Sequence, residues 1–423
     1  MKGQFYMAEH NDTIQHFHQR LHSATRQGVH AAYIPPREKL IELIIKEMEY
    51  NGYSKTDMEQ QLQNLSFAEK IAPSEHQELM GFLMLYEMFD LIQSVFESGQ
   101  LVDEDDNPLR WVEPLTYGTV RGKPLGASLQ LSDRQDQGII KIPVDLIMLA
   151  NLLSNSFALG LPCDIITSRQ WDSINVDTVG RNLRKNVDGA NKFADLMFDY
   201  YQHGIPTIDK HRYTLNSKYD NIVYNMQTGF LLFVIAHEYA HLWLNHTEQS
   251  IENEQEADSM ATDIALTAME LLQKASPDKY DMTELSAGSL LFFIADNLFQ
   301  MLHNIKNEVE NNVVQAQSIT HPSTESRAMA FLAVVVPELD NHDGIYRAIA
   351  EISEYYQKGF VDRLYNTLHF DNVFKKYNLH LDKSKDFKHG DSIMSDLLAP
   401  YLKPFFEDSS GSLLESVSNK GFG

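Results

Sequence analysis

The amino-acid sequence predicts a mainly α-helical fold of the α+β kind, with a helical core, a small β-sheet and a helical N-terminal region. Apolar residues recur at helical spacing over residues 37–97 and again from 226 to about 357. Between these stretches, residues 98–139 are rich in Gly, Pro and Asp and contain short β-prone pieces, which predicts loops and a small sheet. Helical segments are expected to resume near Pro143.

The chain has 423 residues, of which 43% are hydrophobic and 22% are charged, a composition typical of a globular protein with a sizeable core. This length indicates two or three domains. We expect a helical N-terminal region at 1–97, a mixed region of loops, strands and helices at 98–225, a helical core at 226–360, and a C-terminal helical extension and tail at 361–423.

The net charge of -24 and the pI of about 5.0 argue against general nucleic-acid binding and against docking on anionic membranes. Cys163 is the single cysteine, so the chain cannot form an internal disulfide and a reducing setting is expected. The first 20 residues lack the apolar core of a signal peptide. Polar residues interrupt the most apolar windows, 142–162 and 286–302, which predicts buried helices, no membrane span and a cytoplasmic protein.

One strongly apolar stretch, FVIAHEYAHLWLNH at 233–246, carries two histidines four residues apart, with a glutamate beside the first. On a helix, His237 and His241 lie one turn apart on the same face, where two neutral imidazoles can bind one zinc ion. Glu238 is turned by roughly 100° about the helix axis, which aims it at a water on the metal and suits it to act as a general base. The alternative is a buried helix whose histidines bond to backbone or water.

A third ligand is expected downstream, in the segment ENEQEADSMATDIA at 252–265. A stripe of small residues lies on one face of this predicted helix: Ala257, Ala261, Ala265 and Ala268. Because small residues let two helices approach closely, Glu254 on that face would reach the metal, and Asp258 would accept the free N–H of a ligand histidine. The alternative is an acidic first turn that suits a helix N-terminus. Glu256 is the alternative third ligand.

Another zinc arrangement, HExxHxxGxxH, is excluded because it needs glycine at position 244 and histidine at position 247. The chain has Leu244 and Thr247 there. His246 is one residue away from the required position, and we expect it to be a helix-end histidine that complements the helix dipole.

HEYAH followed by ENEQEAD resembles the gluzincin zinc metallopeptidases, in which HExxH supplies two ligands and a downstream ExxxD supplies the third. The ExxAD form at 254–258 is most similar to the group of CAAX prenyl proteases and HtpX-type proteases. SITHPSTESRAMAFL at 318–332 resembles the THPxxExR element of that group. The resemblance implies a zincin-like metallopeptidase core at 226–360. It also implies that His321 donates a hydrogen bond to the developing oxyanion and that Arg327 anchors this loop; a helix start with a solvent salt bridge is the alternative.

The chain differs from that group because it lacks their membrane spans. As a soluble HExxH protein with a long unrelated N-terminal part, it also resembles the Lit peptidases, the phage-exclusion proteases of bacteria. These resemblances imply a zinc-dependent endopeptidase that acts on proteins or peptides, regulated or used in phage defence, with the N-terminal region as the place for a regulatory protein partner. A substrate would add a strand to an exposed sheet edge, and residues 214–225 form either such an edge or plain loop. The alternative function is a protein-binding or sensor module with a structural or inactive zinc site.

Overall fold

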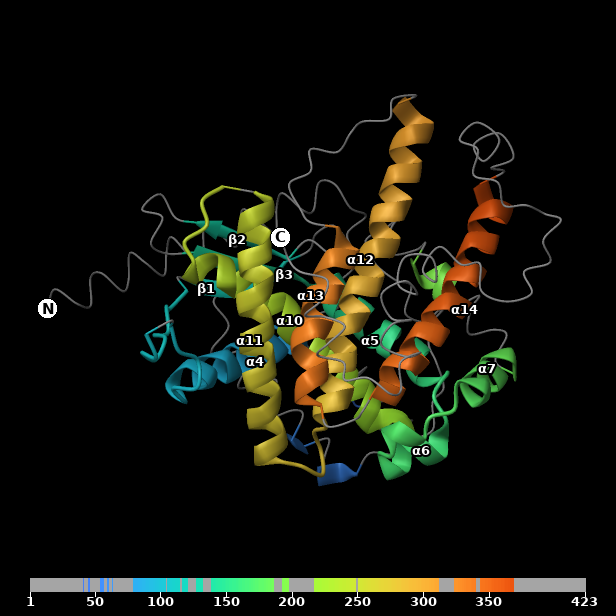
Figure 1. The fold of residues 1–423 in the computed structure, drawn as a ribbon, viewed down its shortest axis with the longest axis horizontal. Helices are drawn as coiled ribbons and strands as arrows, with labels where there is room; N and C mark the ends of the chain where they lie inside the picture. Colours follow the sequence, from blue (N-terminus) through green and yellow to red (C-terminus); the bar gives the residue numbers. More distant parts are fainter. Residues whose placement is uncertain are drawn as a thin grey trace, which may run out of the picture.

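The computed structural model of the chain describes residues 79–103, 105–114, 116–120, 127–131, 138–185, 192–197, 217–248, 250–311, 323–339 and 343–368, with a few isolated positions between 41 and 63. These residues form a mainly helical fold with one small sheet, which confirms the predicted fold class (Figure 1). The α-helices are α4 (Leu79–Glu97), α5 (Val144–Ala158), α6 (Cys163–Ser168), α7 (Val176–Lys185), α10 (Asp220–Trp243), α11 (Ile251–Ala275), α12 (Met282–Asn311), α13 (Thr324–Glu338) and α14 (Asp343–Leu368). The chain also has two short 3-10 helices, η1 (Trp171–Ser173) and η2 (Ser217–Tyr219), and residues 192–197 are helical as well.

The sheet contains β1 (Thr116–Val120), β2 (Ser128–Leu131) and β3 (Gly138–Pro143) in the order β1-β3-β2. β1 runs parallel to β3, with Tyr117 opposite Ile140, and β2 runs antiparallel to β3, with Leu129 opposite the same residue. The predicted sheet within 98–139 is therefore present, although its central strand continues to Pro143. Among the described residues β2 pairs with β3 alone, so its other side is an edge of the described sheet.

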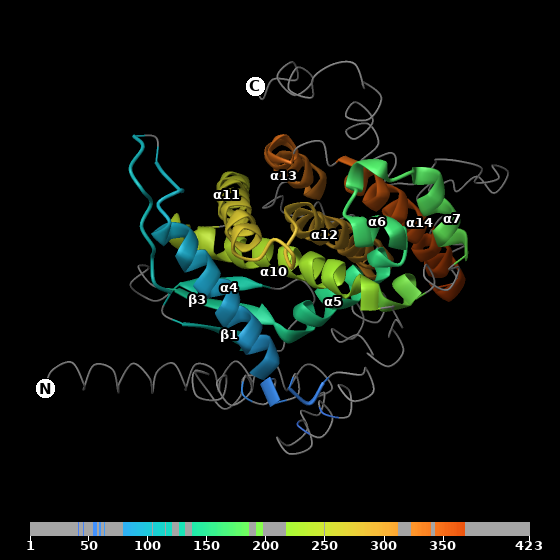
Figure 2. The same cartoon turned by 90° about the horizontal axis from the view of Figure 1, so that it is seen from below.

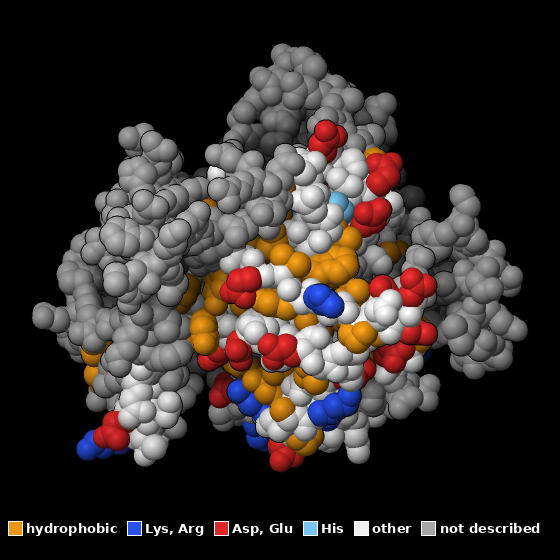
Figure 3. Space-filling model, turned by 90° about the vertical axis from the view of Figure 1, so that its left-hand side faces the viewer, with side chains coloured by type: hydrophobic (Ala, Val, Ile, Leu, Met, Phe, Trp, Pro, Cys, Tyr) orange, Lys and Arg blue, Asp and Glu red, His pale blue; other side chains and the backbone are white. Residues whose placement is uncertain are grey.

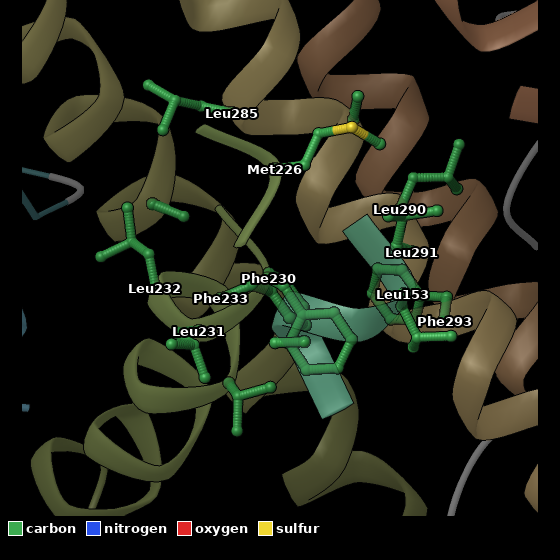
Figure 4. Packing of buried hydrophobic residues seen from close by; sticks show 14 of the residues in the cluster. Leu153, Met226, Phe230, Leu231, Leu232, Phe233, Leu285, Leu290, Leu291 and Phe293 are labelled. Atoms are coloured by element: carbon green, nitrogen blue, oxygen red, sulfur yellow. The ribbon is translucent and has the colours of Figure 1, made fainter. Parts of the chain in front are cut away.

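Helix α10 lies in the middle of the molecule, with α11, α12 and α13 on one side and the sheet, α4 and α5 on the other (Figure 2). Its apolar residues are buried all round, as expected for a central helix. Phe230 and Phe233 point into a cluster with Leu290, Leu291 and Phe293 of α12 (Figure 4). The windows around 142–162 and 286–302 form α5 and α12, and both are buried helices as predicted.

The crossing of α10 and α12 depends on two glycines. A Cβ atom added at Gly229 would overlap the carbonyl oxygen of Leu285, and one added at Gly288 would overlap the carbonyl oxygen of Met226. The hydroxyl of Ser289 donates a hydrogen bond to the Gly229 carbonyl at 3.0 Å. The two backbones are therefore in direct contact, and only residues without a side chain fit at these positions.

A buried polar cluster lies near the start of α10. The Asn225 side-chain amide donates to the Glu284 carboxylate and, at 3.1 Å, to the Lys279 carbonyl oxygen. Arg169 Nε lies 3.4 Å from Glu284 Oε1. Burial and the neighbouring Asp281 raise the pKa of Glu284 to about 7, against the opposing effects of Asn225 and Arg169. The cluster thus links three parts of the fold: α10, the connection between α11 and α12 with the start of α12, and Arg169, the residue that follows α6.

The possible edge strand at 214–225 is wrong for the residues that the structure describes. Residues 217–219 form η2, and α10 begins at Asp220, while residues 214–216 lie outside the described part of the chain. Ile222, Met226 and Phe230, four residues apart, are fully buried on one face of the helix. The apolar residues recur here at helical spacing, which favours a helix, although the β-branched residues in the segment favour a strand.

Buried hydrophobic residues from Leu85 to Tyr356 form one cluster, and the proposed division into four regions stays a prediction. None of the helices in the described part of the chain is both long enough and apolar enough to cross a membrane. On the side of the molecule that carries the sheet and α11, acidic side chains surround a patch of hydrophobic ones (Figure 3).

Candidate metal centre

The candidate site forms where the last turns of α10 meet the first turns of α11. α10 ends at Trp243, and Asn245 adopts a left-handed backbone with φ 55°, which turns the chain back. α11 then begins after Ser250, whose side chain accepts a hydrogen bond from the Asn253 backbone N–H at 3.1 Å. The four residues of the predicted small-residue stripe are all fully buried: Ala257, Ala261, Ala265 and Ala268. The two helices are therefore packed closely, as their sequences predict.

The predicted ligands His237, His241 and Glu254 lie together at this crossing. One potential ligand atom from each lies within 4.8 Å of the others. Nε2 of His241 is 3.2 Å from Nε2 of His237, and the Glu254 carboxylate oxygens are 3.4 Å from His237 Nε2 and 3.6 Å from His241 Nε2. Ligand atoms that surround a tetrahedral ion at about 2.0–2.1 Å are roughly 3.4 Å apart, so this triangle fits a metal ion of that kind.

Glu256, the alternative third ligand, points elsewhere. Its side chain is 62% exposed, and Oε2 lies 3.2 Å from Nε2 of His246. Glu254, in contrast, is buried and contacts both histidines. The geometry therefore places Glu254 rather than Glu256 in the triangle.

The buried carboxylate of Glu238 lies beside the triangle. It accepts a hydrogen bond from the backbone N–H of Leu129 on β2. Burial and the nearby Glu254 raise the pKa of Glu238 above its ordinary value, and the two histidines and the Leu129 N–H oppose this shift. A carboxylate with a raised pKa is a stronger base, so the position suits proton transfer.

Two charged residues, Asp258 and Arg327, lie on the Nδ1 side of His237, away from the triangle. Nδ1 of His237 lies 2.9 Å from Oδ1 of Asp258. Arg327 on α13 donates two hydrogen bonds to the same carboxylate, from Nε at 2.7 Å and from Nη2 at 2.9 Å. Because both Asp258 and Arg327 are buried, this bidentate pair is a buried ion pair, and the alternative of a solvent salt bridge for Arg327 does not describe it.

The electrostatics of the site favour a positive charge. Burial alone lowers the pKa of His237, but the carboxylates of Asp258 and Glu254 outweigh it and raise that pKa to about 9. Burial alone raises the pKa values of Glu254 and Asp258, but contacts with His237 bring both below their ordinary values, helped at Asp258 by Arg327. The ionised carboxylate of Glu254 and the two imidazoles form a donor set suited to a divalent cation.

The element that resembles THPxxExR begins outside the described residues. Thr320, His321 and Pro322 are not among them, so the role of His321 stays a prediction. From Ser323 onward the segment forms a capped helix, because the Ser323 hydroxyl accepts a hydrogen bond from the Ser326 backbone N–H at 3.1 Å. Thr324 also donates to Asp296 on α12 at 2.8 Å. These contacts orient the first turn of α13, from which Arg327 reaches Asp258.

Two contacts at the site were not expected from the sequence. Leu129 lies in a short β-prone segment more than 100 residues before Glu238, and no periodicity links the two. Nδ1 of His246 lies 2.9 Å from Nδ1 of His241. The signal for the second contact was present, because Asn at the residue after a helix end often adopts the left-handed conformation that brings the next side chain back over the helix.

The peptidase family Peptidase U49, a family of Lit-type peptidases, matches residues 179–349, about two fifths of the chain. This range includes α10, α11, α12 and α13, and with them His237, Glu238, His241, Glu254 and Arg327. No curated protein and no solved structure matches the chain significantly. The gluzincin and HtpX-type resemblance has no support from these comparisons. Residues 179–349 are thus similar to a family of peptidases.

Proposed function

We propose that the protein is a zinc-dependent metalloendopeptidase. The observation that supports the proposal is the triangle of His237, His241 and Glu254 with the carboxylate of Glu238 beside it, within the range that matches a peptidase family. Two imidazoles and one carboxylate are a ligand set of catalytic zinc sites, which keep a further position open. A structural site does not need a buried carboxylate beside the ligands, so Glu238 favours an enzyme over a module with a structural ion.

The residues of the chain have distinct roles in this proposal. His237, His241 and Glu254 would bind Zn²⁺, which lowers the pKa of water and polarises a carbonyl oxygen when it is present. Glu238 would accept the proton of the attacking water and return it to the leaving amine. Asp258 would hold Nδ1–H of His237, and Arg327 would keep Asp258 in place. His321 remains the predicted donor to the oxyanion.

The sheet offers a place for an extended substrate. β2 is an edge strand, and the Leu129 N–H that faces away from β3 reaches Glu238. A peptide that adds a strand to this edge would bring one of its carbonyl groups near the triangle. In this proposal β2, rather than residues 214–225, offers the sheet edge for the substrate. The phage-defence role and a regulatory partner of the N-terminal region stay predictions.

The first experiment measures zinc per chain by elemental mass spectrometry in the native protein and in Glu254→Ala. We expect about one zinc ion in the native chain and a large loss in the variant. The absence of zinc from metal-replete native protein would favour the alternative function, a binding or sensor module.

A second variant separates metal binding from catalysis. Glu238→Gln removes the base but no ligand, so it should retain zinc and lose hydrolysis of an unfolded protein substrate such as casein by at least about 100-fold. Full hydrolysis by this variant would contradict the role of Glu238.

A further inference from the structure

We infer that His246 is a positioning residue for the metal centre: its Nδ1 accepts the hydrogen bond of His241 Nδ1–H, which turns Nε2 of His241 toward the ion. This inference rests on the proposed zinc site and deepens it. The contact joins the two Nδ1 atoms at 2.9 Å, and Nε2 of His246 lies 3.2 Å from Oε2 of Glu256. His246 itself does not belong to the ligand triangle.

The end of α10 places His246 against His241. The His246 backbone N–H donates to the His241 carbonyl oxygen at 3.0 Å, and the Asn245 N–H donates to the Leu242 carbonyl oxygen at 3.1 Å. With φ 55° at Asn245, these two bonds form a Schellman motif. In this motif the residue at the position of His246 packs against the residue at the position of His241, usually through a hydrophobic contact. Here two imidazoles make that contact, with ring centroids 5.1 Å apart.

The chemistry of neutral imidazoles assigns one direction to these hydrogen bonds. Nε2 of His241 faces His237 and Glu254, so it must be unprotonated to bind an ion, and the proton of His241 is on Nδ1. The facing Nδ1 of His246 must then be the acceptor, and the proton of His246 is on Nε2. That Nε2–H points to the carboxylate of Glu256, which accepts it. The three residues thus form a consistent donor-to-acceptor chain that ends on a carboxylate.

This chain of hydrogen bonds gives a role to Glu256, the alternative third ligand. Glu256 follows Glu254 by two residues on α11, so its side chain points to the other side of the helix and faces away from the ion. The His246 side chain is only 8% exposed, whereas that of Glu256 is 62% exposed. His246 is therefore held in a defined position, and the carboxylate that fixes its tautomer is in contact with solvent.

The test measures metal affinity in the full-length protein, because positioning residues around metal ligands typically change affinity by about 10–100-fold. His246→Ala removes the acceptor and should weaken the binding of Zn²⁺ and Co²⁺, measured by competition with a chromophoric chelator, by about this factor. The visible absorption bands of the Co²⁺ form should also change, because they report the geometry of the ligands. Oδ1 of asparagine can occupy the place of Nδ1 of histidine, so His246→Asn should restore both readouts to within about threefold of the native protein.

The matched control is Glu252→Gln, which removes an exposed carboxylate from the same first turn of α11 and should leave affinity and spectrum unchanged. Native affinity and spectrum in His246→Ala, together with loss of metal in Glu254→Ala, would overturn the inference and leave the proposed site intact. Equal weakening in the Ala and Asn variants, with a lowered melting temperature of both metal-free proteins, would show a packing role and also overturn it. A native protein that binds neither ion would overturn the proposed function itself.

Discussion

The first half of α10 packs its backbone against another helix, whereas one face of its second half meets the ionisable side chains of α11. At Gly229 the carbonyl group of Leu285 occupies the space of a side chain. At His237, the carboxylates of Glu254 and Asp258 and, behind them, the guanidinium of Arg327 fill the corresponding space. One continuous helix therefore meets two kinds of surroundings, although both halves are buried.

The two halves impose different requirements on the sequence. Direct contact between two backbones requires a residue without a Cβ atom. A side chain added at one such position therefore prevents the helices from crossing. Burial of charged groups requires that each has its partner, because an unpaired buried charge costs several kcal/mol. That requirement is shared by residues of α10, α11 and α13. The first half should thus be sensitive to a single methyl group and the second half to the loss of any one partner.

The largest effect is expected from Gly229→Ala in the first half. The added methyl group would overlap the Leu285 carbonyl oxygen, which cannot move without displacing the backbone of α12. We expect a loss of more than about 4 kcal/mol in the free energy of unfolding, or no folded protein at all. Thermal and urea unfolding followed by circular dichroism measure this loss.

Gly180→Ala on α7 is the matched control, since a Cβ there would meet its nearest atoms, in the side chains of Arg184 and Glu351, at 3.5 Å, an ordinary contact. It should leave stability unchanged or raise it by up to about 1 kcal/mol, because alanine favours a helix more than glycine does. Similar stabilities of the two variants would show that the backbones of α10 and α12 are not in direct contact.

A smaller effect, divided between stability and metal binding, is expected from Asp258→Asn in the second half. The substitution leaves the buried Arg327 without its bidentate carboxylate, which should cost about 3 kcal/mol of stability. It also removes the carboxylate behind His237, which should weaken zinc binding by about 10–100-fold. Urea unfolding of the metal-free protein and competition with a chelator measure the two losses separately.

The double variant Asp258→Asn with Arg327→Met sharpens this result. It removes the guanidinium that has lost its bidentate partner, so part of the stability should return, while zinc binding should stay weak because His237 still lacks its carboxylate. Recovery of both properties would show that Asp258 acts only as the partner of Arg327.

The smallest effect is expected from Glu284→Gln in the polar cluster beside the first half. Since the pKa of Glu284 is raised from 4.5 to about 7, the folded chain binds this proton more tightly than the unfolded chain does. The stability due to this proton is complete below pH 4.5 and decreases as the pH rises to about 7, above which it stays constant. The native protein should thus lose about 1–3 kcal/mol between pH 4.5 and pH 8 through this group. The variant should lack this decrease.

Urea unfolding at several pH values measures the decrease, and Glu270→Gln on α11 is its control. Glu270 forms an i,i+4 ion pair with Lys274 in contact with solvent, so its substitution should leave the slope unchanged. An identical slope in the native protein and in Glu284→Gln would exclude Glu284 as its source.

The sequence predicts those parts of the site that depend on helical periodicity. His237 and His241 share a face because they are four residues apart, and the same spacing brings Glu254 and Asp258 to the face with the alanine stripe. The order of helices, loops and short strands also follows from local composition. Arg327 could be placed near the site only through a family resemblance, because nothing in its local pattern points to Asp258.

The parts that could not be predicted depend on contacts between distant segments. β1 pairs in parallel with β3, although β2 lies between them in the sequence. The sheet edge near Glu238 belongs to β2. The close crossing at Gly229 and Gly288 leaves no periodic signal, because an isolated glycine in a helical pattern has several explanations. The edge strand or loop expected at 214–225 is a helix from Asp220 onward, because the β-branched residues there, Ile222 and Val223, also fit a buried helical face.

The ion pair between Asp258 and Arg327 has a consequence for the newly made chain. The two residues are 69 positions apart, and at about 5–20 residues per second a ribosome needs roughly 3–14 s to extend the chain from one to the other. The proposed ligands on α10 and α11 are synthesised before Arg327, which binds the Asp258 carboxylate. The contacts around the proposed metal centre are therefore complete only after most of the segment that matches the peptidase family, 179–349, has been made.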